Sequence, residues 1–586
     1  MAGGLLNLIA IGNANVFLTG DPTKTFFRVA YCKHTNFGLQ KFRIDYNGTR
    51  DLRLTEASTF LFKVPRYADL LMDTYLVFSL PDIWSPIFPP IQKRLDSNGN
   101  VQNEGKHTNN KWVPYEFRWI EDLGAQMIQE IEIRAGSFVL ARYGGNYISA
   151  MASRDFCEKK KKAFDHMTGN VKELNNPALA YNRENAYPNV YYDESNPPVS
   201  GLEPSIRGRN LYIPLNAWFT MDSRCAFPLV SLQYSELEIS VTIRPIQDLF
   251  QVRDVQDVND VYEYPYIRPD FNQDRFQMFR FLQGPVKQYI AHATDSNGEY
   301  PSEDNNNFPL DYGTMDKDAY ENEINVWNAD IHLISTYAFL SETEAKKFAK
   351  EEQIYLVKEV HTHKFDNIYG SKKVKLETTG MVANWMWYFQ RNDVNLRNEW
   401  SNYSNWPYKR LPNDVVNPPT SLLLHPPDLD GIQFNTGLRI SGDYSVENQK
   451  NIMLNMGIIL DGKYRENTLP SGIFDYIEKY ARTSGYAKEG IYCYQFCLDT
   501  GPRVYQPSGA INLGKFKNIE LEFQTHIPQI DSTASNFELN CLDGQVVGVN
   551  KSTWRLYEYT YNLEIFEERY NVISFISGNC ATMFAR

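Results

Sequence analysis

Short runs of alternating apolar and polar residues, closed by proline or glycine, recur along almost the whole 586-residue chain. Early examples are STFLFKVP at 58–65 and LLMDTYLVFSLP at 70–81. Two further runs in 127–145 flank Ala135–Ser137, which predicts a hairpin turn there. A period of two puts every second side chain on one face, so each run can bury that face only as part of a sheet. The pattern therefore predicts an all-β chain with a few short helices.

The second half of the chain repeats this organisation. YSELEISVTI at 234–243 and FKNIELEFQT at 516–525 share one alternation and lie 282 residues apart, close to half the chain. Strand-like runs resume at 328–340, and a short helix follows, with Ser341 as its cap and Glu344 completing a capping box. An internal repeat of this size predicts two related β-sandwiches in tandem.

The distribution of strand-like and polar segments predicts the domain boundaries. We expect an N-terminal arm at 1–25, a first sandwich at 26–247, a polar linker or surface excursion at 248–325 and a second sandwich at 326–586. Long polar connections are expected to form outer loops at 85–112, 152–210 and 390–435.

Charge and hydropathy argue against two classes of partner. The net charge is −12, whereas nucleic-acid binders usually carry a basic stripe that contacts phosphates. The one dense basic run, Lys159–Lys162, is interpreted as a solvated helix face or loop. No segment approaches about 18 consecutive apolar residues, the length that a membrane-spanning helix needs. We therefore expect neither direct contact with nucleic acid nor a membrane span.

Metal chemistry is the catalytic hypothesis that the sequence allows to be tested most directly. Cupin enzymes hold a metal with an HxH…E motif and a later histidine that follows a Pro-x-Gly corner. His361 and His363 would share a strand face, but no carboxylate follows them at the required spacing. The later corner, Pro507–Gly509, is present, yet Asn512 stands where the ligand histidine should be.

We therefore assign no catalytic, cofactor-binding or metal-binding residue and expect no enzymatic activity. The corner is interpreted as structural: Pro507 fixes its φ, Gly509 permits a positive φ, and Asn512 is a turn or hydrogen-bonding residue. Three N-x-S/T sequons occur at Asn47, Asn402 and Asn550, and they leave glycosylation open.

Several longer segments resemble the double jelly-roll major capsid proteins of nucleocytoplasmic large DNA viruses, and are most similar to those of giant viruses. The similarity runs in order through most of the chain. It includes Leu-Thr-Gly-x-Pro at 18–22, the segments at 66–83 and 119–148, LYIPLNAWFTMDSRCAFPLVSLQYSELEI at 211–239, GIYCYQFCLDTGPRVYQPSGAINLGKF at 490–516 and YNVISFISGNCATMF at 570–584. The chain departs from the family pattern at 134–136 and 223–229.

This resemblance implies a double jelly roll and a function in building a virus shell. The implied protein forms pseudo-hexagonal homotrimeric capsomers, which tile the icosahedral capsid of a large double-stranded DNA virus. Its implied partners are further copies of itself, minor capsid and penton proteins, and surface fibres or glycans. It would be made and assembled in the host cytoplasm, with the arm facing inward and gripping neighbours.

Two other functions stay open at this point. One is a β-sandwich carbohydrate-binding or attachment protein, for which the Tyr- and Trp-rich segment 398–408 would supply stacking surfaces. The other is a minor capsid component of the same virion.

Overall fold

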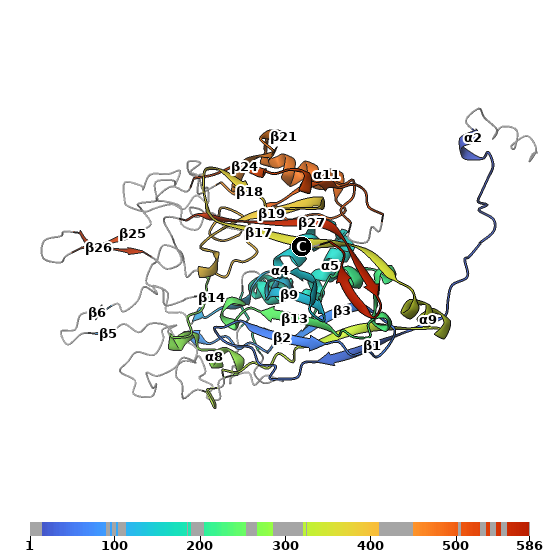
Figure 1. The fold of residues 1–586 in the computed structure, drawn as a ribbon. Helices are drawn as coiled ribbons and strands as arrows, with labels where there is room; N and C mark the ends of the chain where they lie inside the picture. The colour runs from blue at the N-terminus through green and yellow to red at the C-terminus, as the bar shows by residue number, and fades with distance from the viewer. Residues whose placement is uncertain are drawn as a thin grey trace, which may run out of the picture.

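The alternating segments form two β-sandwiches, shown in Figure 1 as a blue-to-green lobe and a yellow-to-red lobe. The computed structural model describes residues 15–88, 94–95, 101–102, 113–183, 186–188, 204–253, 266–284, 320–323, 325–409, 449–501, 506–527, 535–539, 546–551 and 559–584. Within this part of the chain, no helix is long and apolar enough to cross a membrane.

The first sandwich consists of two antiparallel sheets. Its main strands are β1 (Phe37–Asp45), β2 (Ser58–Lys63), β3 (Leu70–Ser79), β9 (Ile128–Ala135), β10 (Phe138–Tyr143), β11 (Asn210–Pro214), β13 (Leu237–Ile243) and β16 (His332–Leu340). One sheet has the order β1-β16-β3-β11 and the other has the order β10-β9-β13-β2. In chain order, the first, eighth, third and sixth strands thus form one sheet, and the remaining strands form the other.

The second sandwich repeats this topology strand for strand. Its main strands are β17 (Gln353–Ile368), β18 (Ser371–Lys375), β19 (Met381–Arg391), β20 (Met453–Leu460), β21 (Lys463–Pro470), β22 (Ile491–Gln495), β24 (Ile519–Thr525) and β27 (Tyr561–Ile576). Their sheets are β17-β27-β19-β22 and β18-β24-β20-β21. This strand order is that of a jelly roll. The predicted all-β fold of two tandem jelly rolls is therefore confirmed.

The repeat detected in the sequence corresponds to equivalent strands. Strand β13 in the first lobe and β24 in the second lie 282 residues apart, and both alternate between buried and partly or fully exposed positions. The hairpin predicted at Ala135–Ser137 joins β9 to β10, with Gly136 at φ 59°. A positive φ is easily adopted by glycine, so this residue suits the tight turn.

The predicted boundary at 326 between the lobes is wrong by one strand. Strand β16 lies in the sequence region assigned to the second sandwich. It pairs with β1 and β3, however, and so completes the first jelly roll. Helix α9 (Glu342–Lys350) then leads to β17, where the second jelly roll begins. Ser341 precedes this helix as predicted, but its side chain makes no capping bond to the backbone.

The predicted linker at 248–325 is also partly wrong. Strand β14 (Phe250–Arg253) pairs with β8 (Phe117–Trp119) and with β15 (Tyr266–Ile267). Phe250, Phe276 and Phe281 are buried in the first core. Aromatic side chains in this polar segment are therefore part of the lobe, while residues 285–319 lie outside the described residues.

The predicted outer loop at 152–210 begins instead with packed helices. Helices α4 (Gly145–Asp155), α5 (Glu158–Thr168) and α6 (Lys172–Asn175) precede the short helix η1 (Pro177–Asn182). Residues 190–203, most of 85–112 and 410–435 lie outside the described residues. The described part of the arm runs further than predicted, because α2 (Asn15–Leu18) and the irregular, exposed chain up to residue 36 precede β1.

The remaining elements are short. They are β4 (Ile87–Phe88), β5 (Arg94–Leu95), β6 (Val101–Gln102), β7 (Val113–Pro114), α3 (Leu123–Gln126), α7 (Trp218–Met221), η2 (Ser223–Cys225), β12 (Phe227–Pro228), η3 (Leu229–Ser231), η4 (Ile246–Asp248), η6 (Asp274–Phe276), α8 (Phe279–Leu282), η8 (Val394–Leu396), η11 (Ile473–Ile477), α11 (Glu478–Arg482), β23 (Ile511–Asn512), η12 (Leu513–Lys515), β25 (Ser535–Leu539), β26 (Val546–Lys551) and β28 (Asn579–Thr582).

The assignment of β16 to the first jelly roll can be tested by truncating a buried side chain in this strand. Leu333 in β16 is fully buried, so we expect Leu333→Ala to lower the free energy of unfolding by about 2–5 kcal/mol. Hydrogen exchange should accelerate first in its neighbours β1 and β3. The matched variant Leu563→Ala in β27 should instead accelerate exchange in β17 and β19. Faster exchange in β19 but not in β3 for Leu333→Ala would contradict the assignment.

Candidate functional site

Helix α4 lies between the two lobes and is the central element of their junction (Figure 1). It follows β10 of the first lobe, and nearly all of its residues are buried. Gly145 begins the helix, and a Cβ atom there would lie only 1.7 Å from the Ala125 carbonyl oxygen. Glycine therefore permits the close approach of α4 to α3. A helix buried on all sides must satisfy its polar side chains with protein partners.

Arg154, at the end of α4, is the centre of a buried ionic cluster that joins the lobes. Its guanidinium contacts Asp155 beside it and donates to Glu568 on β27 at 2.7 Å and to Asn384 on β19 at 2.9 Å. Asn384 also donates to the other Glu568 oxygen at 2.8 Å. Tyr147, two turns earlier on the same face of the helix, donates to Glu568 at 2.9 Å. One carboxylate of the second lobe thus accepts bonds from two residues of α4.

Burial and pairing have opposite effects on the ionisation of this cluster. Burial alone raises the pKa of the Glu568 carboxyl, but the positive charges of Arg154 and Lys358 outweigh it, and the pKa is lowered. The pKa of Asp155 is raised, chiefly by burial. The pKa of Arg154 is raised because its two carboxylate partners outweigh the burial. The arrangement keeps an ion pair charged inside the protein, where it specifies geometry more than it adds stability.

A second ionic cluster surrounds Asp122, which begins α3 in the left-handed conformation at φ 54°. Its carboxylate pairs with Lys488 of the second lobe and accepts a bond from Ser401 at 3.0 Å. Ser149 on α4 and Asn170 donate to the same carboxylate. Burial raises the pKa of Asp122, but the charges of Lys488 and Lys409 outweigh this effect and hold it well below its usual range.

The segment 398–408, considered as a sugar-stacking surface, contributes to the junction instead. Asn398 donates to the carbonyl oxygens of Gln247 and Phe250, and the Trp400 indole donates to that of Asp248 at 2.9 Å. Tyr403 is buried. The carbohydrate-binding hypothesis loses its stacking surface, because these side chains are packed against the first lobe.

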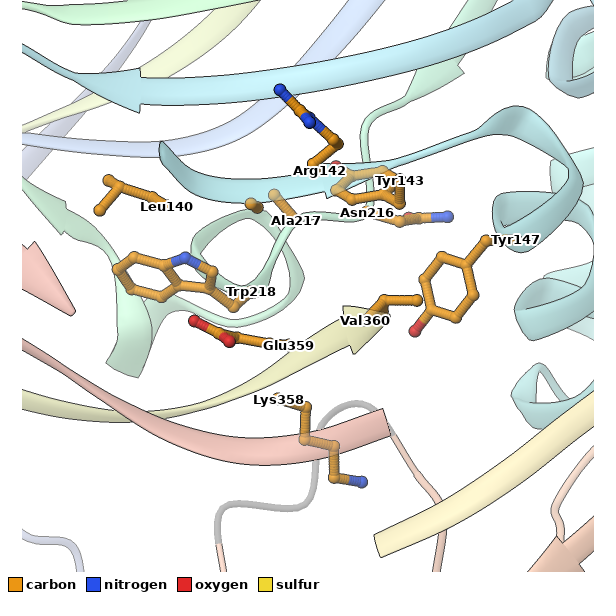
Figure 2. A pocket seen from close by; sticks show the side chains of 11 residues that line it. Leu140, Arg142, Tyr143, Tyr147, Asn216, Ala217, Trp218, Lys358, Glu359 and Val360 are labelled. Atoms are coloured by element: carbon orange, nitrogen blue, oxygen red, sulfur yellow. The ribbon is translucent and has the colours of Figure 1, made fainter. Parts of the chain in front are cut away.

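A small cavity lies beside α4, between β10 and β17. Its volume is ≈ 40 Å³, enough for a few water molecules but far below that of an ordinary small-molecule site. Figure 2 shows Trp218 and Glu359 facing each other across it, with Arg142 and Lys358 pointing away. Lys358 donates to the Thr500 carbonyl at 3.2 Å. The geometry of this cavity suits hydration of the junction rather than binding of a substrate.

The two histidines of the metal hypothesis lie in different surroundings on β17. His361 Nε2 is 3.5 Å from a Glu359 oxygen, and His363 Nε2 is 4.0 Å from a Glu567 oxygen. The Trp385 indole also donates to Glu567 at 2.9 Å. Burial lowers the pKa of His363 despite the neighbouring Glu567. Across the described ranges, no three His, Cys, Asp or Glu side chains gather in a way that could hold a metal.

The Pro507–Gly509 corner is a folded turn, as interpreted. Gly509 has φ 134°, and the Ser508 hydroxyl accepts a bond from the Asp499 amide at 3.0 Å. Asn512 accepts a bond from the Gly514 amide at 3.1 Å and pairs with β19 through its backbone. The predicted positive φ of Gly509 and the hydrogen-bonding role of Asn512 are confirmed.

The lysine run and the glycosylation sequons considered in the sequence analysis include both exposed and buried residues. Lys159 and Lys162 are exposed on α5, as predicted for the basic run, while Lys161 pairs with Asp165. Asn47 is exposed, but Asn402 is buried and donates to the Trp406 carbonyl at 2.9 Å. Asn402 therefore cannot carry a glycan in this fold. The side chain of Asn550 lies outside the described residues.

Sequence reasoning missed the junction residues, although a signal was present. Arg154 and Asp155 end an otherwise weakly polar stretch, GNYISAMASRD, in which isolated charges predict buried pairing. Their partners could not be predicted, because Asn384 and Glu568 lie more than 200 residues away. The chemistry of the site is structural: it fixes one lobe against the other.

Two jelly rolls of identical strand order, joined in one chain by buried ion pairs, are the fold of the double jelly-roll capsid proteins. Two family models match the chain. The model described as major capsid protein N-terminus matches residues 25–272, and that described as large eukaryotic DNA virus major capsid protein matches residues 344–581. The chain therefore belongs to the family of major capsid proteins of large eukaryotic DNA viruses. Such proteins self-assemble into capsomers and shells, so this is a structural protein of the virion.

Individual relatives show the same family. The major capsid protein of Phaeocystis pouchetii virus is 23% identical over 96% of this chain and 97% of its own length. That of Chrysochromulina ericina virus is 29% identical over 44% of each chain. The quasi-atomic model of the PBCV-1 virus capsid contains a chain with a TM-score of 0.55 and 15% identity, covering 96% of this chain and 100% of that one. At this identity, the structural likeness concerns the fold.

The buried ionic cluster predicts a large cost for removing one charge. Glu568→Gln leaves Arg154 buried with one carboxylate fewer, so we expect the free energy of unfolding to fall by about 3–5 kcal/mol. Glu342→Gln, which breaks the exposed pair with Lys346, should cost about 1 kcal/mol or less. Urea denaturation measures both variants. Equal costs would show that the cluster does not hold the lobes together.

The lowered pKa of Asp122 predicts a dependence on acid. The ionised carboxyl contributes stability above its ordinary pKa of about 4 and loses this contribution as the pH falls through the lower value of the folded state. Asp122→Asn keeps a residue that tolerates the left-handed backbone, so it isolates the charge. We expect its unfolding free energy to change less than that of the wild type between about pH 4 and pH 2. Exposed Asp366→Asn is the control and should follow the wild type.

Proposed function

We propose that three copies of this chain form a pseudo-hexagonal capsomer that tiles the icosahedral shell of a large double-stranded DNA virus. The observation that carries the proposal is the identical strand order of the two lobes. A threefold ring of such chains presents six similar lobes, and six similar lobes fit a hexagonal lattice. The family resemblance supports the same arrangement.

The junction residues support this function because a tile must keep its shape. The clusters around Arg154 and Asp122 connect the lobes through buried, charge-assisted bonds. Rotation of one lobe against the other would leave these charges buried without partners, which costs several kcal/mol. Each chain can therefore present its lobes at one fixed angle, as a regular lattice requires.

The proposed role is structural and not catalytic. Minor capsid and penton proteins, and surface fibres or glycans, are proposed as further partners, with assembly in the host cytoplasm. Asn47 is a candidate glycan position, because it is exposed in the structure. The family models and the relatives favour a major capsid protein over a minor capsid component, and the copy number in purified particles tests this: a major protein outnumbers every other shell component.

The trimer is tested by the mass of the purified protein. With a chain mass of 67.9 kDa, a trimer has a mass of about 204 kDa. We expect light scattering to give this value at micromolar concentration, independent of dilution over about tenfold. Particles of 67.9 kDa under these conditions would contradict the proposal.

A further inference from the structure

An exposed apolar surface lies where the last strands of the chain meet the start of β17. Ile354 and Leu356 on β17 pair in register with Ser574 and Val572 on β27, so their side chains share the outer face of the sheet. Strand β28 pairs with β27 on the other side and continues this face through Ala581. We call this surface the corner patch; its exposed apolar members are Ile354, Leu356, Ile576 and Met583.

The corner patch has the composition of an interface core. No charged residue occurs between Asn571 and Phe584, in a chain of which 22% is charged. Ile354 on β17 is 59% exposed, and Met583, which directly follows β28 on the other side of β27, is 53% exposed. Depletion of charge and clustering of large apolar side chains distinguish the cores of protein interfaces from other surfaces.

The sheet also has an open edge at this place. Within the described ranges, β17 has β27 as its only partner strand, so it is the outermost strand of its sheet. In the part of the chain that the structure describes, no strand pairs with the outward-facing amide and carbonyl groups of 353–357. Edge strands of this kind accept extended segments from other chains, which gain both backbone bonds and side-chain contacts.

The N-terminal arm has the properties of such a segment. Its side chains from Val16 to residue 36 are all exposed, and Phe27 is 100% exposed. Phe27, Val29 and Tyr31 occur at alternate positions, so in an extended conformation they form one apolar face. Figure 1 shows the arm projecting away from its own chain. The described residues of its own chain leave these apolar side chains uncovered, so a surface of a second copy can cover them.

Charge and position favour this pairing. Between Pro22 and Ile44 the chain has no acidic residue, and the arm contributes Lys24, Arg28 and Lys33. Exposed Glu351 and Glu352 directly precede the open edge of β17. The arm leaves the body where Phe37 pairs with Leu340, and only α9 and its flanking residues separate Leu340 from β17. The donor and acceptor surfaces thus lie in one region of each chain, suited to contact between neighbours.

We propose that residues 26–31 of one copy add as a strand to the open edge of β17 in a second copy and cover its corner patch. Fully extended, residues 26–36 reach about 36 Å from the body. A contact that joins two different surfaces closes into a ring of three copies when each contact rotates the next copy by one third of a turn, as in the proposed trimer. This inference rests on the proposed trimer and specifies which surfaces hold it together.

Photo-crosslinking tests the pairing directly in the full-length protein. A benzophenone amino acid replaces the fully exposed Phe27, and copies labelled with 14N and 15N are mixed before assembly. We expect crosslinked peptides from 353–357 or 571–584, with mixed isotopes in the proportion expected for different copies. Crosslinks confined to one isotope, or to other surfaces, would overturn the inference.

Variants of the acceptor supply the matched control. Ile354→Thr with Leu356→Thr keeps residues suited to an exposed strand but removes apolar area, so we expect the crosslink yield at limiting concentration to fall about tenfold or more. Tyr480→Ser removes a still more exposed ring on α11 and should leave the yield unchanged. Thermal unfolding verifies that both variants are folded. Equal yields for the two variants would sink the inference.

The mass of the unlabelled protein separates this inference from the proposed function. A trimer without the expected crosslink disproves the arm contact and leaves the capsomer proposal standing. A monomer disproves both. A trimer that crosslinks as expected, and loses the crosslink in the acceptor variant, supports both.

Discussion

The pairing of buried charges across the two lobes is the interaction on which the rest of the structure depends. Arg154 and Glu568 are nearly inaccessible, and each is stable there only because the other is in place. Hydrophobic burial can be satisfied by several arrangements of two sandwiches, since it has little directional preference. Bonds from one guanidinium to a carboxylate and an amide on two strands permit one arrangement. The fixed angle between the lobes follows from that selectivity.

The two lobes share a strand order but differ in what covers them. Helices α4 to α6 are inserted between β10 and β11 of the first lobe, whereas the equivalent strands β21 and β22 of the second are joined through η11 and α11. A ring of three such chains therefore alternates two kinds of lobe. Its outline is close to sixfold, but its contacts repeat only threefold, which allows lateral neighbours to be distinguished by the lobe that they meet.

The sequence was most informative where one local rule determined the structure. Alternation predicted the strands and the hairpin at Gly136, because a half-buried strand needs a period of two. It could not assign β16 to the first lobe, since alternation identifies a strand without identifying its neighbour. The polar composition of 248–325 likewise concealed Phe250 and Phe281, whose burial depends on contacts with distant strands. The partners of Arg154 were beyond local reasoning for the same reason.

Charged and apolar contacts have different tasks in this chain, and each kind lies where its task requires it. Within a chain, the junction is closed during folding, so buried charges such as Asp122 and Lys488 can be desolvated once and then retained. Between chains, a surface must remain in water until a partner arrives, and exposed ionic groups keep their hydration and gain little on pairing. Covering an uncharged corner patch with an open strand edge requires no desolvation of charged groups. It removes apolar area from water and pairs backbone groups. The chain thus places directional charge pairs where geometry must be unique and apolar strand edges where copies must meet.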